Sequence, residues 1–505
     1  MTAPHPDPHQ PLRPSRRALL GSSGALAAGA VSTSLFAGSA SAATGQAAAA
    51  TAAGRPAGRA RRPLTAGLHW PSGPGRRIRA QAPDAELRAI MAEIDPARIR
   101  ETIRTLVSFG TRHTLSSQDD PDRGIGAARD WIAKEMRAHA ARSGGRMVVT
   151  VPSYVQQPAD RIPTATRISN VVATLRGSVD PNRTYVVSGH YDSRVTDVMD
   201  STSDAPGADD DASGVAVAME LARVMATRRP DCTLVFAAVA GEEQGLYGST
   251  FLAKRLKAQG ANVEGMFTND IVGNSRAEDG HREPHSLRLF AEGPPSTEDE
   301  DQKALRLLIG GENDSPAREL ARFVNEVAGY RTTKMNIRMI YREDRFLRGG
   351  DNIPFLEQGW PAARFTEPHE NFNHQHQDVR VEDGVQFGDL LRFVDMSYVA
   401  RVAKVNAAWM WSASQAPAMP TGVFVDVTNL TNSTTLLWKR GDDPNLAGYD
   451  VVWRPTINPF WTHAIRVGNV RTATVNLSKD NVVFGVRAVG RSGHRSPAVF
   501  PFPKF

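Results

Sequence analysis

The sequence predicts an α/β fold of three αβα layers, with helices on both faces of a mainly parallel β-sheet, followed by a carboxyl-terminal β-sandwich. Segments of strand type alternate with amphipathic helical segments between residues 85 and 412. The most apolar strand, residues 232–240, has the composition of a fully buried strand. After residue 420, helical periodicity gives way to short alternating strands. A chain of 505 residues is also too long for a single core, which indicates two or more domains.

The elements of the α/β domain follow from hydrophobic periodicity. Residues 125–142, for example, place Trp131, Ile132 and Met136 at helical spacing. The expected helices are 85–107, 125–142, 213–225 and 248–259, and the expected strands are 147–151, 168–175, 184–189 and 232–240. Sheets of this class bind ligands beyond the carboxyl ends of their strands, so functional side chains are expected there.

The carboxyl-terminal domain, residues 418–505, begins after the break at 413–420, which contains Pro417 and Pro420. Trp438, Tyr449 and the run 484–489 resemble a fibronectin type III domain. Such a module binds a polymer or cell surface, or only packs against the domain before it, and both alternatives stay open. Its expected strands are 423–427, 434–439, 448–454, 472–477 and 482–489.

The first 84 residues predict targeting and processing. Arg16-Arg17 precedes a weakly apolar stretch, and Ala40-Ser41-Ala42 supplies small residues at a cleavage site, so residues 1–42 predict a secretory signal that resembles the twin-arginine type. Residues 43–84, rich in Ala, Gly, Arg and Pro, are expected to be a disordered linker or propeptide. The protein is therefore expected to be secreted, and no later segment is long and apolar enough to span a membrane.

Charge and cysteine content exclude other classes of function. The formal charge is +6, but many arginines lie in the first 80 residues rather than on a folded module, so no nucleic-acid partner is expected. Cys232 is the only cysteine and lies beside an apolar run, which indicates a buried small side chain rather than a nucleophile.

Five segments place acidic or histidine residues at expected strand ends or helix starts. Taken singly, each also fits a helix cap or an exposed turn. Three adjacent aspartates, Asp209–Asp211, repel one another unless a cation compensates. Glu242 and Glu243 follow a buried strand, where carboxylates are costly unless paired or metal-bound. The segments are 189–193, with His190 and Asp192; 207–214; 240–245; 268–274, with Asp270; and 371–378, with His374 and His376.

In this order, the five segments resemble the zinc-dependent exopeptidase family of the secreted bacterial leucyl aminopeptidases, whose relatives include glutamate carboxypeptidase II and glutaminyl cyclase. The resemblance covers residues 90–410 and makes 85–412 a zinc peptidase domain. It implies two zinc ions per chain, a peptide substrate and Glu242 as the general base for a water that the zinc ions activate. The final ligand of the family is a His four residues before an Asp, which implies His374, before Asp378, with His376 as the alternative. The remaining implied roles are His190 and Asp270 at one zinc ion, Glu243 at the other, Asp210 as the bridge, and Asp192 orienting His190.

The resemblance implies an aminopeptidase, and the chain also departs from the family pattern. Asn373 stands where some relatives have Tyr, and Gly350-Asp351-Asn352 replaces Ser-Asp-His, so the residues that hold the oxyanion and the substrate's amino terminus stay unidentified. A carboxypeptidase would need a cationic clamp such as Arg342, Arg345 or Arg348. A cyclase with one zinc ion and an inactive binding or adhesion protein are further alternatives, and the complete ligand set argues against both.

Overall fold

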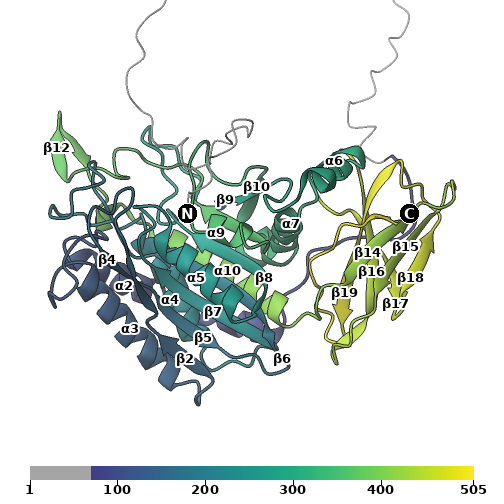
Figure 1. Cartoon of the computed structure of the whole chain (residues 1–505), viewed down its shortest axis with the longest axis horizontal. Helices are drawn as coiled ribbons and strands as arrows, with labels where there is room; N and C mark the ends of the chain where they lie inside the picture. Colours follow the sequence, from purple (N-terminus) through teal and green to yellow (C-terminus); the bar gives the residue numbers. More distant parts are fainter. Residues whose placement is uncertain (1–69, 505) are drawn as a thin grey trace, which may run out of the picture. The chain divides into compact units, whose positions relative to one another are not determined.

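The centre of the molecule is an eight-stranded sheet built around the most apolar strand of the chain. The computed structural model describes residues 70–504; the expected signal at 1–42 and residues 43–69 of the expected linker lie outside that range. Strand β7 (Cys232–Val239) is buried at every position and lies between β6 and β5. The full strand order is β10-β9-β11-β8-β6-β7-β5-β2 (Figure 1).

The sheet is mixed, with parallel pairs at its centre and also at the edge formed by β10 and β9. Strand β6 (Asp180–His190) pairs parallel with both β7 and β8 (Asn262–Asn269), whereas β5 pairs antiparallel with β7 and with β2. Parallel neighbouring strands need a long crossover connection. Between β2 and β5 the chain forms only the small hairpin of β3 and β4, so β2 and β5 pair antiparallel. The other bounds are β2 Met147–Thr150, β3 Ser153–Gln156, β4 Thr166–Ser169, β5 Val171–Leu175, β9 Ser286–Ala291, β10 Asn336–Ile340 and β11 Ala362–Thr366.

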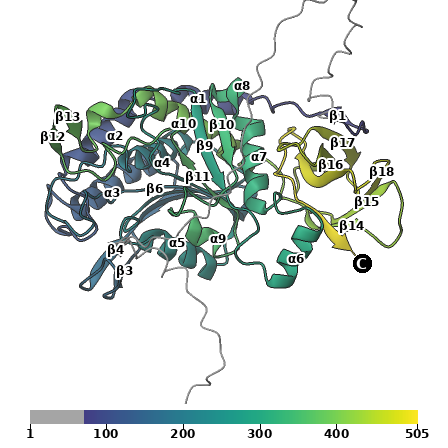
Figure 2. The same ribbon diagram turned by 90° about the horizontal axis from the view of Figure 1, so that it is seen from above.

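Helices cover both faces of this sheet, which confirms the predicted α/β class. Helices α4 (Ala212–Met225) and α10 (Met396–Ser414) lie on one face, and α5 (Tyr247–Ala258) lies on the other (Figure 2). The helix expected at 85–107 is two helices because Asp95 caps a second one that begins at Pro96. The remaining bounds are α1 Ala85–Glu93, α2 Pro96–Ser108, α3 Ile125–Ala141, α6 Glu300–Leu308, α7 Pro316–Ala328, α8 Tyr330–Thr333 and α9 Ile353–Leu356.

The carboxyl-terminal region forms two four-stranded sheets, as a sandwich requires. Their strand orders are β1-β17-β16-β19 and β18-β15-β14-β20, and Trp438 and Tyr449 pack edge to face between them at 5.4 Å. Strand β1 (Arg76–Arg77) lies in the stretch where the sequence analysis expected a linker, and it pairs with β17. The other bounds are β14 Thr421–Asp426, β15 Thr434–Lys439, β16 Leu446–Pro455, β17 His463–Gly468, β18 Thr472–Val475, β19 Val482–Gly490 and β20 Phe502–Lys504.

Buried ion pairs join the sandwich to helix α7 and the turn before it. Arg454 of β16 donates to both carboxylate oxygens of Asp314, at 2.7 and 2.8 Å. Trp461 donates its indole N–H to Glu319 of α7 at 2.8 Å. These partners are buried, so the sandwich packs against the α/β region through specific polar contacts. Within residues 70–504, no helix has both the length and the apolar character needed to cross a membrane.

Candidate metal centre

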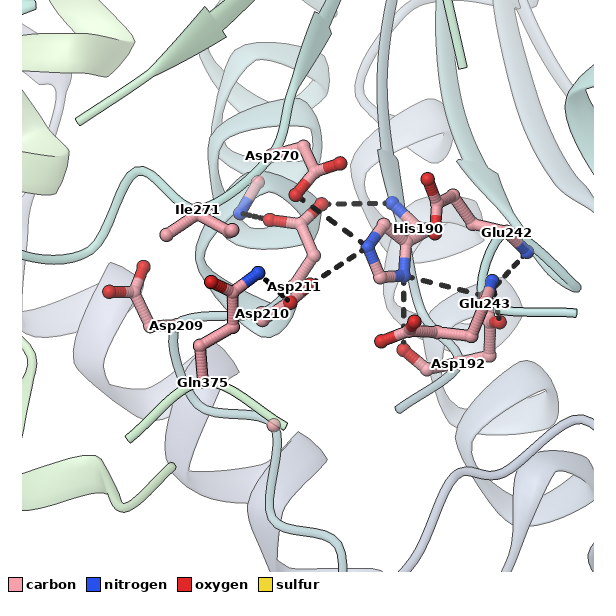
Figure 3. Close-up of polar contacts among 12 residues, drawn as sticks. His190, Asp192, Asp209, Asp210, Asp211, Glu242, Glu243, Asp270, Ile271 and Gln375 are labelled. Atoms are coloured by element: carbon pink, nitrogen blue, oxygen red, sulfur yellow. Dashed lines mark hydrogen bonds and ion pairs between the residues drawn. The ribbon is translucent and has the colours of Figure 1, made fainter. Parts of the chain in front are cut away.

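Two groups of metal-binding side chains meet at the carboxyl edge of the sheet, and they share one carboxylate. His190, Asp210 and Asp270 form the first group, and Asp210, Glu243 and His376 form the second; in each, the candidate ligand atoms lie within 4.8 Å of one another. Asp210 Oδ1 lies 3.1 Å from His190 Nε2, and Asp210 Oδ2 lies 2.9 Å from His376 Nε2. Asp210 therefore presents one oxygen to each group, as a bridging carboxylate does. Figure 3 shows the contact between Asp210 and His190.

The other two aspartates of the run 209–211 hold the backbone rather than face the groups. Asp211 accepts from the His190 N–H and the Gly214 N–H, both at 2.9 Å, and so ties the end of β6 to the first turn of α4. Asp209 accepts from the Gly273 N–H at 2.6 Å. The peptide bond between Asp210 and Asp211 is cis. Neither Asp209 nor Asp211 belongs to either group.

Gly214 allows helix α4 to approach strand β8 closely enough to bring these groups together. A Cβ at this position would lie 1.9 Å from the Asn269 carbonyl oxygen, a distance that no side chain tolerates. Asn269 ends β8 and directly precedes Asp270, while α4 begins just after Asp210. The close contact therefore sets the separation of two carboxylates that are distant in sequence.

Asp389 supports the same turn from a distant part of the chain, and the sequence analysis missed it. Its carboxylate accepts from the Asp209 N–H at 2.9 Å and from the Asp210 N–H at 2.8 Å. Burial raises the pKa of Asp389 well above its ordinary value, and the charge of Asp209 adds to the rise. Burial also raises the pKa of Asp209 to about 7. A single aspartate outside any motif carries no sequence signal for this role.

Asp192 positions both His190 and the turn that carries Glu242 and Glu243. Its Oδ2 accepts from the Glu243 N–H at 3.1 Å and from the Thr114 hydroxyl at 3.2 Å, and its Oδ1 accepts from the Glu242 N–H at 3.4 Å. The Nδ1 of His190 lies 3.1 Å from the Asp192 carbonyl oxygen and 3.5 Å from Oδ1. A proton on Nδ1 leaves Nε2 free for a metal ion. Thr114 was also missed by sequence reasoning.

Glu242 lies beside the groups without belonging to either, as a general base should. Burial raises the pKa of Glu242 well above its ordinary value, and the negative charges of Asp270 and Glu243 raise it further, while His190 acts in the opposite sense. A bound cation would also lower this pKa, because it favours the carboxylate. Figure 3 shows Glu242 and Glu243 in successive positions next to His190. Asp351 lies in the segment Gly350-Asp351-Asn352, which differs from the family's Ser-Asp-His. This residue is buried, and burial raises its pKa to about 7.

The structure corrects the choice between the two histidines of the segment 371–378. His376 Nε2 lies 3.0 Å from Glu243 Oε1 and joins the second group, whereas His374 belongs to neither. The His374 ring stacks on Phe393 with centroids 3.7 Å apart, and burial lowers its pKa to about 4. The loop reaches a φ of 55° at His376, a local conformation that the spacing to Asp378 could not reveal. The geometry therefore places His376, and not the expected His374, among the candidate ligands.

A buried arginine holds Asp270 from behind. Arg364 on β11 is fully buried and donates from Nη1 to Asp270 Oδ2 at 2.6 Å. Its charge lowers the pKa of Asp270 against the effect of burial. Next to it, Glu370 pairs with Arg345 and Arg348, two of the three arginines considered for a carboxylate clamp. The third, Arg342, is exposed and lies over the Phe346 ring at 5.0 Å.

Glu370 is expected to contribute a pH-dependent part of the stability. Burial opposes its charge, but Arg345 and Arg348 outweigh burial and lower the Glu370 pKa from 4.5 to about 2, a difference worth about 3 kcal/mol. Because the folded pKa is the lower one, this stabilisation is present above pH 4.5 and is lost as the pH falls toward 2. Glu370→Gln should therefore lower the free energy of unfolding in urea at pH 7 by about 3 kcal/mol, and by less at pH 3.

The matched control is Glu382→Gln, which removes an exposed ion pair with Arg380. That change should alter the free energy of unfolding by no more than about 0.5 kcal/mol. An equal loss for Glu370→Gln at pH 7 and pH 3 would contradict the assigned pKa.

The donor set fits zinc. His190 Nε2 and Glu243 Oε1 are buried and have no hydrogen-bond partner within residues 70–504, although each belongs to a metal-binding group. Imidazole nitrogen and carboxylate oxygen are ligands that zinc accepts together. Two such groups with a shared carboxylate have the donors for a pair of ions.

Comparison with known proteins agrees with this chemistry. The model of peptidase family M28 matches residues 170–382. The chain is 60% identical over 422 residues to a probable zinc metalloprotease of Leptosphaeria maculans, covering 84% of this chain and 98% of that protein. It is 58% identical to a probable zinc metalloprotease of Pyricularia oryzae, covering 87% and 89%. Among solved structures, the LapA aminopeptidase of Legionella pneumophila is 17% identical at a TM-score of 0.47, covering 69% of this chain and 79% of that one.

Proposed function

Because the chain belongs to peptidase family M28 and is a zinc metallopeptidase, we propose that it is a two-zinc aminopeptidase that removes amino-terminal residues from peptides. The observation that carries the proposal is the sharing of Asp210. One of its oxygens faces His190 and the other faces His376, so the ligands form two groups around one carboxylate. The side chains of the two groups would hold a pair of ions, which would supply a metal-activated water and an electrophile for the substrate carbonyl.

The side chains around the proposed ions have different roles in the hydrolysis. When bound, two zinc ions lower the pKa of a shared water and polarise the scissile carbonyl. Glu242 takes the proton of the attacking water and delivers it to the leaving amine. Asp192 keeps Glu242 in place by accepting from its main-chain N–H at 3.4 Å. Asp270 stays ionised because Arg364 donates to it at 2.6 Å.

The charges around the site favour an amino terminus over a carboxylate as the group that is recognised. Arg348 donates to both oxygens of Glu370, at 2.8 and 2.9 Å, and Arg345 bonds Asp344 and Glu370. Two of the three proposed clamp arginines are thus occupied by carboxylates of the protein. A substrate carboxylate therefore has fewer free cations to bind it, which supports the amino terminus as the recognised group.

A substrate panel tests the exopeptidase mode. Aminoacyl p-nitroanilides with a free amino terminus should be hydrolysed, and their N-acetylated forms should not, because acetylation removes the free amine that an aminopeptidase recognises. Incubation with a chelator should abolish hydrolysis, and added zinc should restore it. Comparable cleavage of the acetylated substrates would contradict the aminopeptidase proposal, and full activity after metal removal would contradict the metal mechanism.

Export and the role of the sandwich are part of the same proposal. The twin-arginine-type signal expected at 1–42 supports a secreted enzyme. That route exports proteins after they have folded, which suits an enzyme that binds its metal before export. The contacts of Arg454 with Asp314 and of Trp461 with Glu319 support packing of the sandwich against the α/β region. Contact of the sandwich with a polymer or cell surface stays a prediction.

A further inference from the structure

A third group of metal-binding side chains lies apart from the two groups that share Asp210. It consists of His281, Glu283 and His369, whose candidate ligand atoms all lie within 4.8 Å of one another. His281 and Glu283 come from the connection between β8 and β9, and His369 comes from the loop after β11. We propose that this group is an additional site for zinc or a similar transition-metal cation, which joins these two loops.

The distances match those of a single zinc ion. Each imidazole Nε2, of His281 and of His369, lies 3.6 Å from Glu283 Oε1. Ligand atoms at zinc bond lengths in a tetrahedron lie about 3.3 Å apart, so a small adjustment brings all three within reach of one ion. The two imidazole rings meet at 80° with centroids 5.0 Å apart. Two histidines on one tetrahedral zinc ion place their ring centres about 5 Å apart.

The donor atoms of this group also favour a cation. His369 Nε2 is a buried atom with no hydrogen-bond partner within residues 70–504, and it faces Glu283. Two imidazoles with one carboxylate suit zinc, copper and nickel, and leave positions open for water.

The site would reinforce links that already exist between the two loops. Glu278 accepts from the Phe372 N–H at 2.9 Å, and Glu367 accepts from the Asn274 N–H at 2.7 Å. A cation held by His281, Glu283 and His369 would add a further connection between the same loops. The loop that it fastens continues to His376 of the proposed active centre.

Metal stoichiometry tests the proposal. The full chain, stripped of metal and reloaded with zinc, is dialysed and measured by elemental mass spectrometry, next to the His281→Ala/His369→Ala double variant. The wild type should hold one zinc ion more than the double variant. His285→Ala is the matched control, because His285 is an exposed histidine of the same connection that belongs to no group. It should retain the wild-type zinc content.

The difference between wild type and double variant separates this proposal from the proposed function. A difference of zero would overturn the additional site, whatever the remaining number of ions. A remaining number below two would instead contradict the two-zinc centre. Glu283→Gln serves as a second variant if the double variant does not fold, and it should lose the same ion. Added zinc should raise the melting temperature of the wild type more than that of either variant, because a ligand that binds only the folded state stabilises it.

Discussion

Replacing Glu242 with glutamine should remove nearly all turnover and leave the zinc content unchanged. The amide keeps the size of the side chain and cannot accept the proton of the attacking water, so kcat should fall by about 10²- to 10⁴-fold. Glu242 belongs to neither metal-binding group, which is why zinc should stay bound. The measurement is kcat on a free aminoacyl substrate, together with zinc per chain by elemental mass spectrometry.

The neighbouring glutamate provides the matched control. Glu243 belongs to the second group, with its Oε1 3.0 Å from His376 Nε2, so Glu243→Gln should lose zinc as well as activity. The two adjacent substitutions thus separate a base from a ligand. A Glu242→Gln enzyme that retains its kcat would contradict the assignment of the base, and one that loses zinc would make Glu242 a ligand.

Replacing His376 with alanine should remove one zinc ion and most of the activity, whereas the same change at His374 should keep both ions. His376 Nε2 lies within 3.0 Å of both Asp210 and Glu243, at 2.9 and 3.0 Å. Removing a residue that supports a metal ligand lowers metal affinity by about 10- to 100-fold. Removing the ligand itself should lower the affinity by more. Zinc affinity by competition with a chromogenic chelator, followed by kcat, measures both effects.

His374→Ala is expected to act on stability instead. The ring stacks on Phe393, and loss of such a contact costs about 0.5 to 1.5 kcal/mol. Urea unfolding should show that loss while zinc content and kcat stay near those of the wild type. If His374→Ala releases zinc and His376→Ala does not, the family spacing to Asp378 was the better guide and the assignment is reversed.

The large elements of the α/β region could be predicted because each has a local cause. Strand β7 is a continuous apolar run, and helix α4 follows three aspartates that favour its amino terminus. One difference also has a local cause, because Pro96 begins a second helix. The other is tertiary: the strand expected at 168–175 divides into β4 and β5 at Asn170, whose side chain accepts from the N–H of Ala240, 70 residues away, at 3.2 Å. Strand β1 carries no such signal, because two arginines become a strand only through pairing with β17.

The chemistry of the centre follows from the order of residues along the chain: a histidine and carboxylates lie at strand ends, in an order that resembles a two-zinc exopeptidase. Only the tertiary structure decided which atoms meet. It placed His376 rather than His374 at Asp210, and it brought Asp389, Arg364 and Thr114 behind the ligands. The reason is physical. Strand and helix signals depend on neighbours along the chain, whereas a ligand's direction depends on loop conformation and on buried partners that are remote in sequence.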